Sequence, residues 1–281
     1  MSNETSNSLV SLGNLTKPAN TLIEKSSAAV GGLFLPYQIK RVAKAEAEAA
    51  LIKAKSEIQI TDLHRRAMHR FVEEEAKKQE NMEQITGQAL PLLEESSTPE
   101  DVEDDWLTNF FDKCRIISDE DMQLLWSKVL ASEANSPGAF SKRTVNSLSS
   151  LDKNDALSFT QLCNFGWQID DSLSPLVYDK DDDIYERCSI SYGKLSHLES
   201  IGLIRQIDFI GSFTLNCDSS VISASYDDHS IQLHLEDGKI NIGKVMLSQT
   251  GKELAMVCDV ESVEGFKEYV CNKWRELGYI H

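Results

Sequence analysis

The residues that could do chemistry are scattered and form no familiar catalytic pattern. His64 and His69 are five residues apart in a helical stretch, so they do not share a face. His229 and His234 lie in or beside a predicted hairpin, where their odd spacing places them on opposite faces. The sequence lacks the phosphate-loop, dinucleotide, serine-hydrolase and zinc-protease motifs. We therefore expect no enzymatic activity and no cofactor. An enzyme whose site residues are distant in sequence is the alternative.

Cysteines and acidic residues are the remaining candidate metal ligands. The cysteines occur singly, without a CxxC pair or a His at ligand spacing: Cys114, Cys163, Cys188, Cys217, Cys258 and Cys271. This pattern favours reduced cytoplasmic thiols over a zinc site. The acidic loop 179–183 lacks the frame and the distal Glu of a calcium loop, so we expect it to be solvated. No metal is predicted.

Charge is distributed unevenly along the 281 residues, whose net charge is −17. Residues 1–90 hold 12 Lys and Arg against 11 Asp and Glu, whereas the remainder holds 16 against 34. An acidic body repels phosphate backbones and anionic lipids. Nucleic acid is therefore not an expected partner, and any lipid contact would fall to the N-terminal part.

We expect no secretory signal, because residues 1–8 are polar and lack a basic region. The longest apolar run spans nine residues, 28–36, against the roughly 20 needed to cross a bilayer. We expect residues 1–36 to be a flexible, amphipathic segment of a cytoplasmic protein. A short helix is expected from Lys17 to Val30, with Pro18 in its first turn and Gly31 after its end. Peripheral contact with the inner membrane would use its largest apolar side chains, which are Leu22, Ile23, Leu33, Phe34 and Leu35.

Residues 37–90 are predicted to form one long charged helix, since Tyr37 to Ile85 contains no Pro or Gly and strong helix formers dominate. Its length would be about 70 Å. A thin apolar stripe at steps of three and four runs through Val42, Ala45, Ala49, Ile52, Leu63, Ala67 and Phe71. Such a stripe is typical of a seam for another helix, in this chain or in a second copy, and we expect a homo-oligomer. The alternative is a solvated helix that packs only at its C-terminal end.

The rest of the chain predicts a mainly α protein with a smaller α+β part. Residues 98–167 carry repeated helix-start signals, the last of them at Asp152 to Asp155, and short loops, and together these indicate a helical bundle. Residues 168–281 contain strand-like runs separated by turns at Asp227-Asp228 and Asp237-Gly238, with helices before and after them. The last helix is expected from about Val263 to Leu277, with Phe266, Val270 and Trp274 buried.

Two segments of this last part are similar to winged-helix domains. Residues 194–204 resemble the helix that precedes a wing, and residues 247–254 resemble the phrase that follows it. The helix at 155–163 would be the first helix, and the strands between Ile207 and Ile242 would enlarge the wing. A DNA-binding regulator of this type would use Lys194 and His197, with the basic residues Arg65, Arg66 and Arg70. Because Glu199 shares that helix and the domain is acidic, a protein partner of unknown identity is favoured over DNA.

Longer phrases resemble a bacterial family known as domain of unknown function 2806. They are residues 36–47, 69–81, 105–115 and 125–138, and the likeness extends from about Leu15 to Trp274. The family name implies no activity. Residues 125–131 also resemble the abortive-infection alpha proteins, which implies a role in anti-phage defence. We therefore expect a self-associating interaction or effector protein in such defence, with a winged-helix DNA-binding regulator as the alternative.

Overall fold

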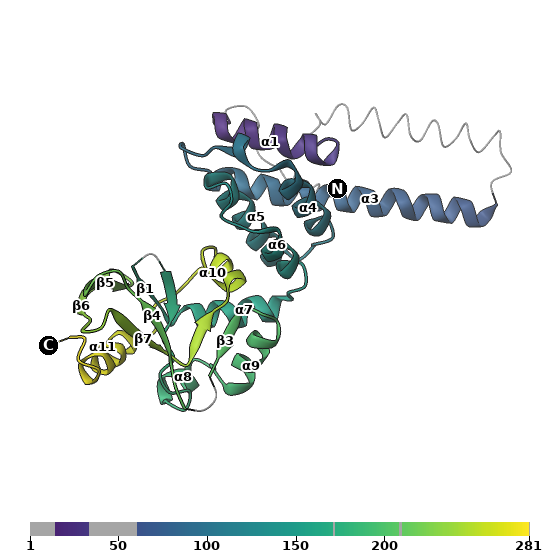
Figure 1. Cartoon of the computed structure of the whole chain (residues 1–281). Coiled ribbons are helices and arrows are strands. Elements are labelled where there is room, and N and C mark those ends of the chain that lie inside the picture. The colour runs from purple at the N-terminus through teal and green to yellow at the C-terminus, as the bar shows by residue number, and fades with distance from the viewer. Residues whose placement is uncertain (1–14, 34–60, 171, 208–209, 281) are drawn as a thin grey trace, which may run out of the picture. The chain divides into compact units, whose positions relative to one another are not determined.

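The computed structural model describes residues 15–33, 61–170, 172–207 and 210–280. Within these ranges it is a mixed α+β protein in which helix predominates, as the sequence predicts. The chain forms two compact units, Met1–Ser149 and Ser150–His281 (Figure 1). The division falls inside residues 98–167, which we predicted as one bundle, so the last helix of that range belongs to the second unit.

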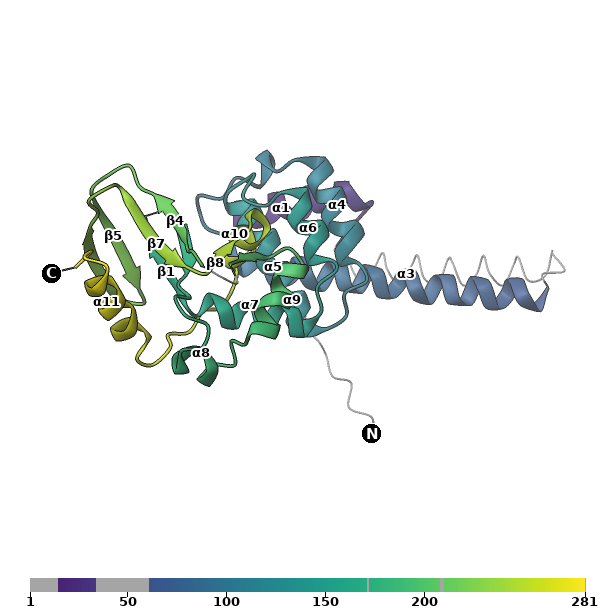
Figure 2. The same cartoon turned by 60° about the horizontal axis from the view of Figure 1, so that its bottom comes forward.

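The described part of the first unit is helical. Its elements are α1 (Lys17–Val30), α3 (Asp62–Ala89), α4 (Asp104–Cys114), α5 (Glu120–Asn135) and α6 (Lys142–Leu148), with 3₁₀ turns at Leu90–Leu92 and Pro99–Asp101. The C-terminal part of α3 packs on α5, while α1 and α6 pack on α4 (Figures 1 and 2). Trp106 stacks on Phe110, and Trp126 meets Phe110 edge-on, with ring centroids 5.1 Å apart in both pairs. These large aromatic rings are buried at the centre of the unit together with aliphatic side chains such as Leu107 and Val129.

Helix α1 has the bounds that its sequence predicts. Thr16 caps its start and Gly31 ends it in the left-handed conformation. Lys25 fixes the helix to the segment before α4, because its ammonium group donates to the carbonyl oxygens of Glu100, at 2.8 Å, and Val102. The helix is therefore an integral part of the first unit and not a flexible segment.

Helix α3 begins at Asp62, later than predicted. Thr61 has an extended backbone (φ −57°, ψ 152°), and its hydroxyl oxygen accepts from the His64 N–H at 3.4 Å. An N-cap of this kind is incompatible with a helix that continues through the same residue. The prediction of one uninterrupted helix over 37–90 is therefore wrong at Thr61, and residues 37–60 lie outside the described part of the chain.

A buried carboxylate closes the loop between α5 and α6. Glu133 is 3% exposed, and its two oxygens accept from the N–H groups of Gly138 and Phe140, both at 2.8 Å. The carbonyl oxygen of Phe140 in turn accepts from the indole N–H of Trp106 at 2.7 Å. Glu133 thus links the loop to the aromatic core.

The second unit combines strands with helices. The helices are α7 (Lys153–Cys163), α8 (Asp183–Arg187), α9 (Tyr192–Ser200), α10 (Gln249–Ala255) and α11 (Phe266–Glu276). The strands are β1 (Gly166–Ile169), β2 (Ser172–Pro175), β3 (Ile204–Gln206), β4 (Phe213–Asn216), β5 (Val221–Tyr226), β6 (His229–His234), β7 (Lys239–Gly243) and β8 (Val245–Leu247).

The strands form three antiparallel sheets. The largest has the order β2-β1-β5-β6, and the other two are the pairs β3-β8 and β4-β7. In the β3-β8 pair Ile204 lies opposite Leu247, so residues between 207 and 244, including β4 to β7, form an insertion between two neighbouring strands. Helix α11 buries Phe266, Val270 and Trp274, as predicted. The indole N–H of Trp274 donates to the Tyr178 hydroxyl at 2.8 Å, which fixes α11 to the second unit.

We predict that Glu133→Ala destabilises the first unit by about 2 kcal/mol, because the buried N–H of Phe140 loses its acceptor. Urea unfolding followed by tryptophan fluorescence measures the change. The exposed Glu95→Ala serves as the control and should stay within about 0.5 kcal/mol of wild type. Equal stability of the two variants would show that the Glu133 carboxylate does not hold this loop.

Candidate functional site

The strongest candidate site is an exposed apolar face on the N-terminal half of α3. Residues 62–77 are all exposed, and among them are Leu63 (65%), Met68 (48%), Phe71 (60%) and Val72 (54%). With Ala67, these residues recur at steps of three to five and lie on one side of the helix. We call this set of five residues the projecting face.

The projecting face continues the buried face of the same helix. At 3.6 residues per turn, Leu63, Ala67 and Phe71 align with Met82, Ile85 and Ala89, which are buried in the first unit. Apolar residues thus lie on the same side of α3 at both ends of the helix, with Glu74, Glu75 and Lys78 between them, and described residues cover only the C-terminal part. Four large apolar side chains in one exposed strip are typical of a contact surface for a protein partner.

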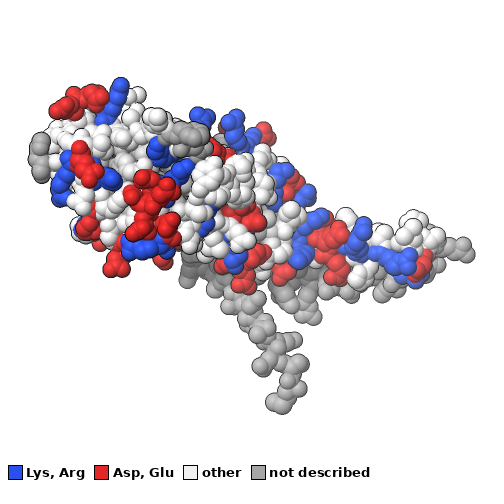
Figure 3. All heavy atoms as spheres, turned by 90° about the horizontal axis from the view of Figure 1, so that it is seen from below, with Lys and Arg blue, Asp and Glu red and all other residues white. Residues whose placement is uncertain are grey.

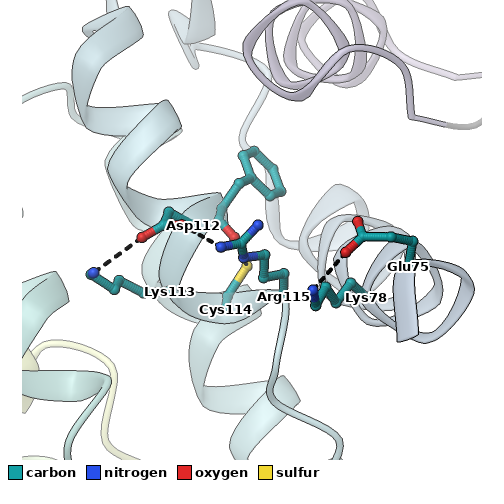
Figure 4. Close-up of polar contacts among 7 residues, drawn as sticks. Glu75, Lys78, Asp112, Lys113, Cys114 and Arg115 are labelled. Atoms are coloured by element: carbon teal, nitrogen blue, oxygen red, sulfur yellow. Dashed lines mark hydrogen bonds and ion pairs between the residues drawn. The ribbon is translucent and has the colours of Figure 1, made fainter. Parts of the chain in front are cut away.

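Polar contacts fix the point where α3 enters the first unit. The Asn81 amide donates to the Arg115 carbonyl oxygen at 2.8 Å, and the Gln123 amide donates to Ile117 O at 2.9 Å and to Asn81 Oδ1 at 3.3 Å. Figure 4 shows α3 beside the end of α4, with Lys78 bound to Glu75 at 2.6 Å and Asp112 bound to Arg115 at 2.8 Å. These contacts hold the base of the projecting half in one orientation.

Two groups near this base have shifted pKa values. The hydrogen bond from Lys113 lowers the pKa of Asp112 against the opposing effect of burial, and Arg115 lowers it further. Burial raises the pKa of the Cys114 thiol well above its usual range, which makes it unreactive. The cluster is therefore a set of charge pairs beside an inert thiol, all within the C-terminal end of α4.

Charged residues surround the projecting face. Arg66 pairs with Asp62 at 3.0 Å and Arg70 with Glu74 at 3.3 Å, both one turn apart. Figure 3 shows basic and acidic side chains following one another along this part of α3. Exposed pairs of this kind contribute only about 0.3–0.5 kcal/mol each, so they remain free to exchange partners.

The structure describes three of the seven residues of the predicted seam. Leu63, Ala67 and Phe71 lie on the projecting face, whereas Val42, Ala45, Ala49 and Ile52 lie outside the described residues. Sequence reasoning missed Met68 and Val72, because it followed a stripe only one residue wide. Met68 and Val72 are four residues apart, and each directly follows a residue of the predicted stripe, Ala67 or Phe71. This spacing could have revealed a broader face.

Two of the residues predicted for membrane contact belong to the protein core. Leu22 (0% exposed) and Leu33 (3%) are buried in the first unit, so neither can meet lipid without leaving it. Ile23 is half-buried, while Phe34 and Leu35 lie outside the described residues. Leu22 is buried because the apolar side of α1 packs on α4. None of the described helices combines the length and apolarity needed to cross a membrane.

The residues considered for DNA contact already have partners inside the protein. In the second unit, the Lys194 ammonium donates to the Gln161 side chain at 2.6 Å, and His197 Nε2 bonds to Asp155 Oδ1 at 2.6 Å. Both contacts join α9 to α7. In the first unit, Arg65 and Arg66 both pair with Asp62 and Arg70 pairs with Glu74. The five residues therefore belong to two separate units, and each of them has a partner within its own unit.

Catalytic and metal-binding arrangements receive no support from the described residues. No group of three or more His, Cys, Asp or Glu among them is placed to hold a metal ion. The acidic loop before α8 instead makes contacts of its own: Asp182 accepts from the Tyr269 hydroxyl at 2.5 Å, and Asp179 accepts from the Asp181 N–H at 3.1 Å.

The fold is that of a mixed α+β protein with two units. In the first unit the N-terminal half of α3 is exposed and packs on no other described element. The model of the family described as "Protein of unknown function (DUF2806)" matches residues 65–271, and the chain therefore belongs to this family. The match begins in the projecting half of α3 and includes most of both units. No curated protein and no solved structure matches the chain.

The Asp155–His197 contact predicts a pH dependence. Partial burial of Asp155 raises its pKa, but hydrogen bonds from His197 and from the Asp152 N–H outweigh burial and lower it. Because the pKa of Asp155 is lower in the folded state than its unfolded value of about 3.9, the ionised carboxylate stabilises the fold at pH values above about 4. This stabilisation is lost as the pH falls below about 4. We expect Asp155→Ala to cost about 1–2 kcal/mol at pH 7, as for a lost helix cap, and less at pH 3. Urea unfolding at both pH values tests this, and an equal cost at both would contradict it.

Proposed function

We propose that this protein is a non-enzymatic interaction protein that self-associates through the projecting face of α3 and acts in anti-phage defence. The observation that carries the proposal is the strip of large exposed apolar side chains, Leu63, Met68, Phe71 and Val72, on a helix anchored at its other end. Leaving such a strip in water is unfavourable by roughly 25 cal/mol for each Å² of apolar surface. A partner helix that covers it would recover this free energy.

A helix is the partner that best fits this surface. The projecting face is about one side chain wide at Ala67 and wider at Phe71 and Val72, and it runs for about two and a half turns, from Leu63 to Val72. Helices pack by placing side chains between residues three and four positions apart, which is the spacing present here. A rigid base supports the interaction, because α3 loses no further freedom where Asn81 and Gln123 hold it.

For the second unit we propose a winged-helix-type arrangement that contacts protein. Its support is the order of α9, the β3-β8 pair with the inserted strands, and then α10. Ser248 caps α10, and a Cβ at Gly251 would lie 2.1 Å from the Leu203 carbonyl oxygen, so glycine is required where α10 meets the end of α9. Because Lys194 and His197 already bond within the unit, DNA is not the favoured partner.

The defence role rests on the resemblance of residues 125–131 to abortive-infection alpha proteins. In α5 this segment supplies the buried side chains of Trp126, Val129, Leu130 and Ala131. The likeness is therefore one of core packing, which supports a related helical unit. Activity against phage needs a direct test.

We predict that Phe71→Glu converts the wild-type assembly to monomer, because two charged side chains would enter an apolar contact. Light scattering measures the mass. In a bacterial host challenged with phage, the same variant should lose protection. Ile116→Glu is the matched control, since Ile116 is 66% exposed in the same unit but lies outside α3, and it should keep both the mass and the protection.

Several outcomes would contradict this proposal. Equal mass for wild type and Phe71→Glu removes the projecting face as the self-association surface. Full protection by Phe71→Glu shows that self-association does not serve defence. Absence of protection by wild type against every phage tried removes the defence role itself.

Filter binding to duplex DNA at low salt tests the alternative regulator. We expect no retention, because the second unit is acidic and its candidate cations are paired. Retention that falls steeply with salt and is reduced about tenfold or more by a Lys194→Ala and His197→Ala double variant would instead support direct DNA contact.

A further inference from the structure

Strand β6 forms an open edge of the largest sheet in the second unit. It pairs with β5 over six residues without a shift in register, and it stands at the end of the order β2-β1-β5-β6 (Figure 1). At the opposite edge α7, α10 and β8 pack on β2, whose last residues, Ser174 and Pro175, are buried. Strand β6 contains no Lys, Arg or Pro, which commonly protect an edge against pairing, so it is able to accept a further strand.

Backbone hydrogen bonds show which groups of β6 face outward. The Leu235 N–H donates to the residue before β5 at 2.7 Å, whereas the His234 N–H donates to the Tyr279 carbonyl oxygen at 2.9 Å. Successive N–H groups of a strand point to opposite edges, so those of Ser230 and Gln232 point outward like that of His234. Both residues are exposed, and no described residue pairs with their outward backbone groups. The segment after α11 thus occupies one position of this edge, and two further positions are open.

The sequence around this edge is acidic. Residues 206–238 contain six acidic residues and no Lys or Arg. Asp227 and Asp228, which form the turn before β6, are both exposed, and no described Lys or Arg pairs with either carboxylate. Two such carboxylates at the end of an open edge attract a cationic segment and repel an acidic one.

We infer that the outer edge of β6 binds an extended basic segment of a partner protein as an antiparallel fifth strand. The inference rests on the proposed contact of the second unit with protein and gives that contact a location, and it does not depend on α3. Antiparallel pairing is the arrangement of β1, β2, β5 and β6 within this sheet, and it is slightly more stable than parallel pairing.

The geometry of the edge specifies what the bound segment looks like. Ser230 and Gln232 each exchange two hydrogen bonds with one residue of the segment. The residue between these two lies opposite Ile231, which is half-buried, so an apolar side chain fits there. An antiparallel segment reaches Asp228 and Asp227 three and four residues later, where Lys or Arg fits.

A second copy of the chain fits this edge less well. Two-fold pairing through both open positions centres on Ile231 and places Ser230 opposite the partner subunit's Gln232. Asp227 then lies beside the partner subunit's Glu236, and like charges at such positions are destabilising. The acidic residues therefore disfavour pairing of β6 with itself and favour a basic strand.

Peptide binding to the full chain tests the inference. The probe is a fluorescent peptide in which valine and threonine alternate over the length of β6 and two arginines follow. Fluorescence anisotropy measures its dissociation constant, and a peptide with glutamates in place of the arginines should bind about tenfold more weakly. With valine beside Ile231, the threonine N–H groups face β6. Methylation of the threonine nitrogens should therefore abolish binding, whereas methylation of the valine nitrogens should leave it within about twofold.

Variants at one position separate backbone pairing from side-chain contact. Gln232→Pro removes an N–H that faces away from β5, so the β5–β6 hydrogen bonds are kept, and binding should weaken about tenfold or more. Gln232→Ala keeps the N–H and should bind within about twofold of wild type. The double variant Asp227→Asn and Asp228→Asn should bind the arginine peptide about fivefold more weakly. Circular dichroism checks that each variant folds, and if Gln232→Pro does not, the methylated peptides decide the question with wild-type protein.

Three results would overturn the inference. They are no binding of the arginine peptide to wild type, undiminished binding of the threonine-methylated peptide, and a solution mass of folded Gln232→Pro below that of wild type, which would place a second copy on this edge. The self-association proposal is judged separately, because Phe71→Glu should bind the peptide like wild type. A monomeric Phe71→Glu together with no peptide binding by wild type leaves self-association standing and removes the β6 site.

Discussion

The burial of the C-terminal half of α3 is the constraint from which the rest of the first unit follows. Met82, Ile85 and Ala89 place this half against α5, and Thr86 bonds back to the Met82 carbonyl oxygen within the buried turn. Asn81 and Gln123 then fix its position relative to the loop after α4. Because a helix is stiff over a few turns, anchoring one half determines where the other half lies. The exposed position of Phe71 is therefore a consequence of packing ten residues away.

Local signals in the sequence were sufficient for many elements. Helix α1 has the predicted bounds because Pro18 and Gly31 favour a start and an end. Asp152 and Asp155 form the expected capping box at the start of α7, and Asp227 adopts the left-handed conformation that the predicted hairpin turn requires. In each case a side chain acts on its own backbone within three residues. Such contacts can be recognised without knowledge of the tertiary fold.

Other features depended on contacts between distant residues. Strands β1 and β2 were missed because they are four residues long and pair in a short hairpin, and β1 gains its second neighbour from β5, more than fifty residues later. Leu22 was assigned to a lipid surface because its burial on α4 leaves no local trace in the sequence. At Thr61 the opposite error occurred: the Thr-Asp pair is a local start signal, but the surrounding helix formers concealed it. Three of the five residues of the projecting face, Leu63, Ala67 and Phe71, were predicted because they repeat at helical spacing. Their exposure could not be predicted, because it depends on how the whole unit packs.

The central claim is that the exposed strip of α3 is covered by a second copy of the chain. Hydrogen–deuterium exchange of the wild-type protein across a range of concentrations tests it most directly. Covering the strip should slow exchange in residues 62–77 as concentration rises, with no change in the already buried segment that contains Met82 and Ile85. Exchange in residues 62–77 that stays the same from the most dilute to the most concentrated sample would contradict the account.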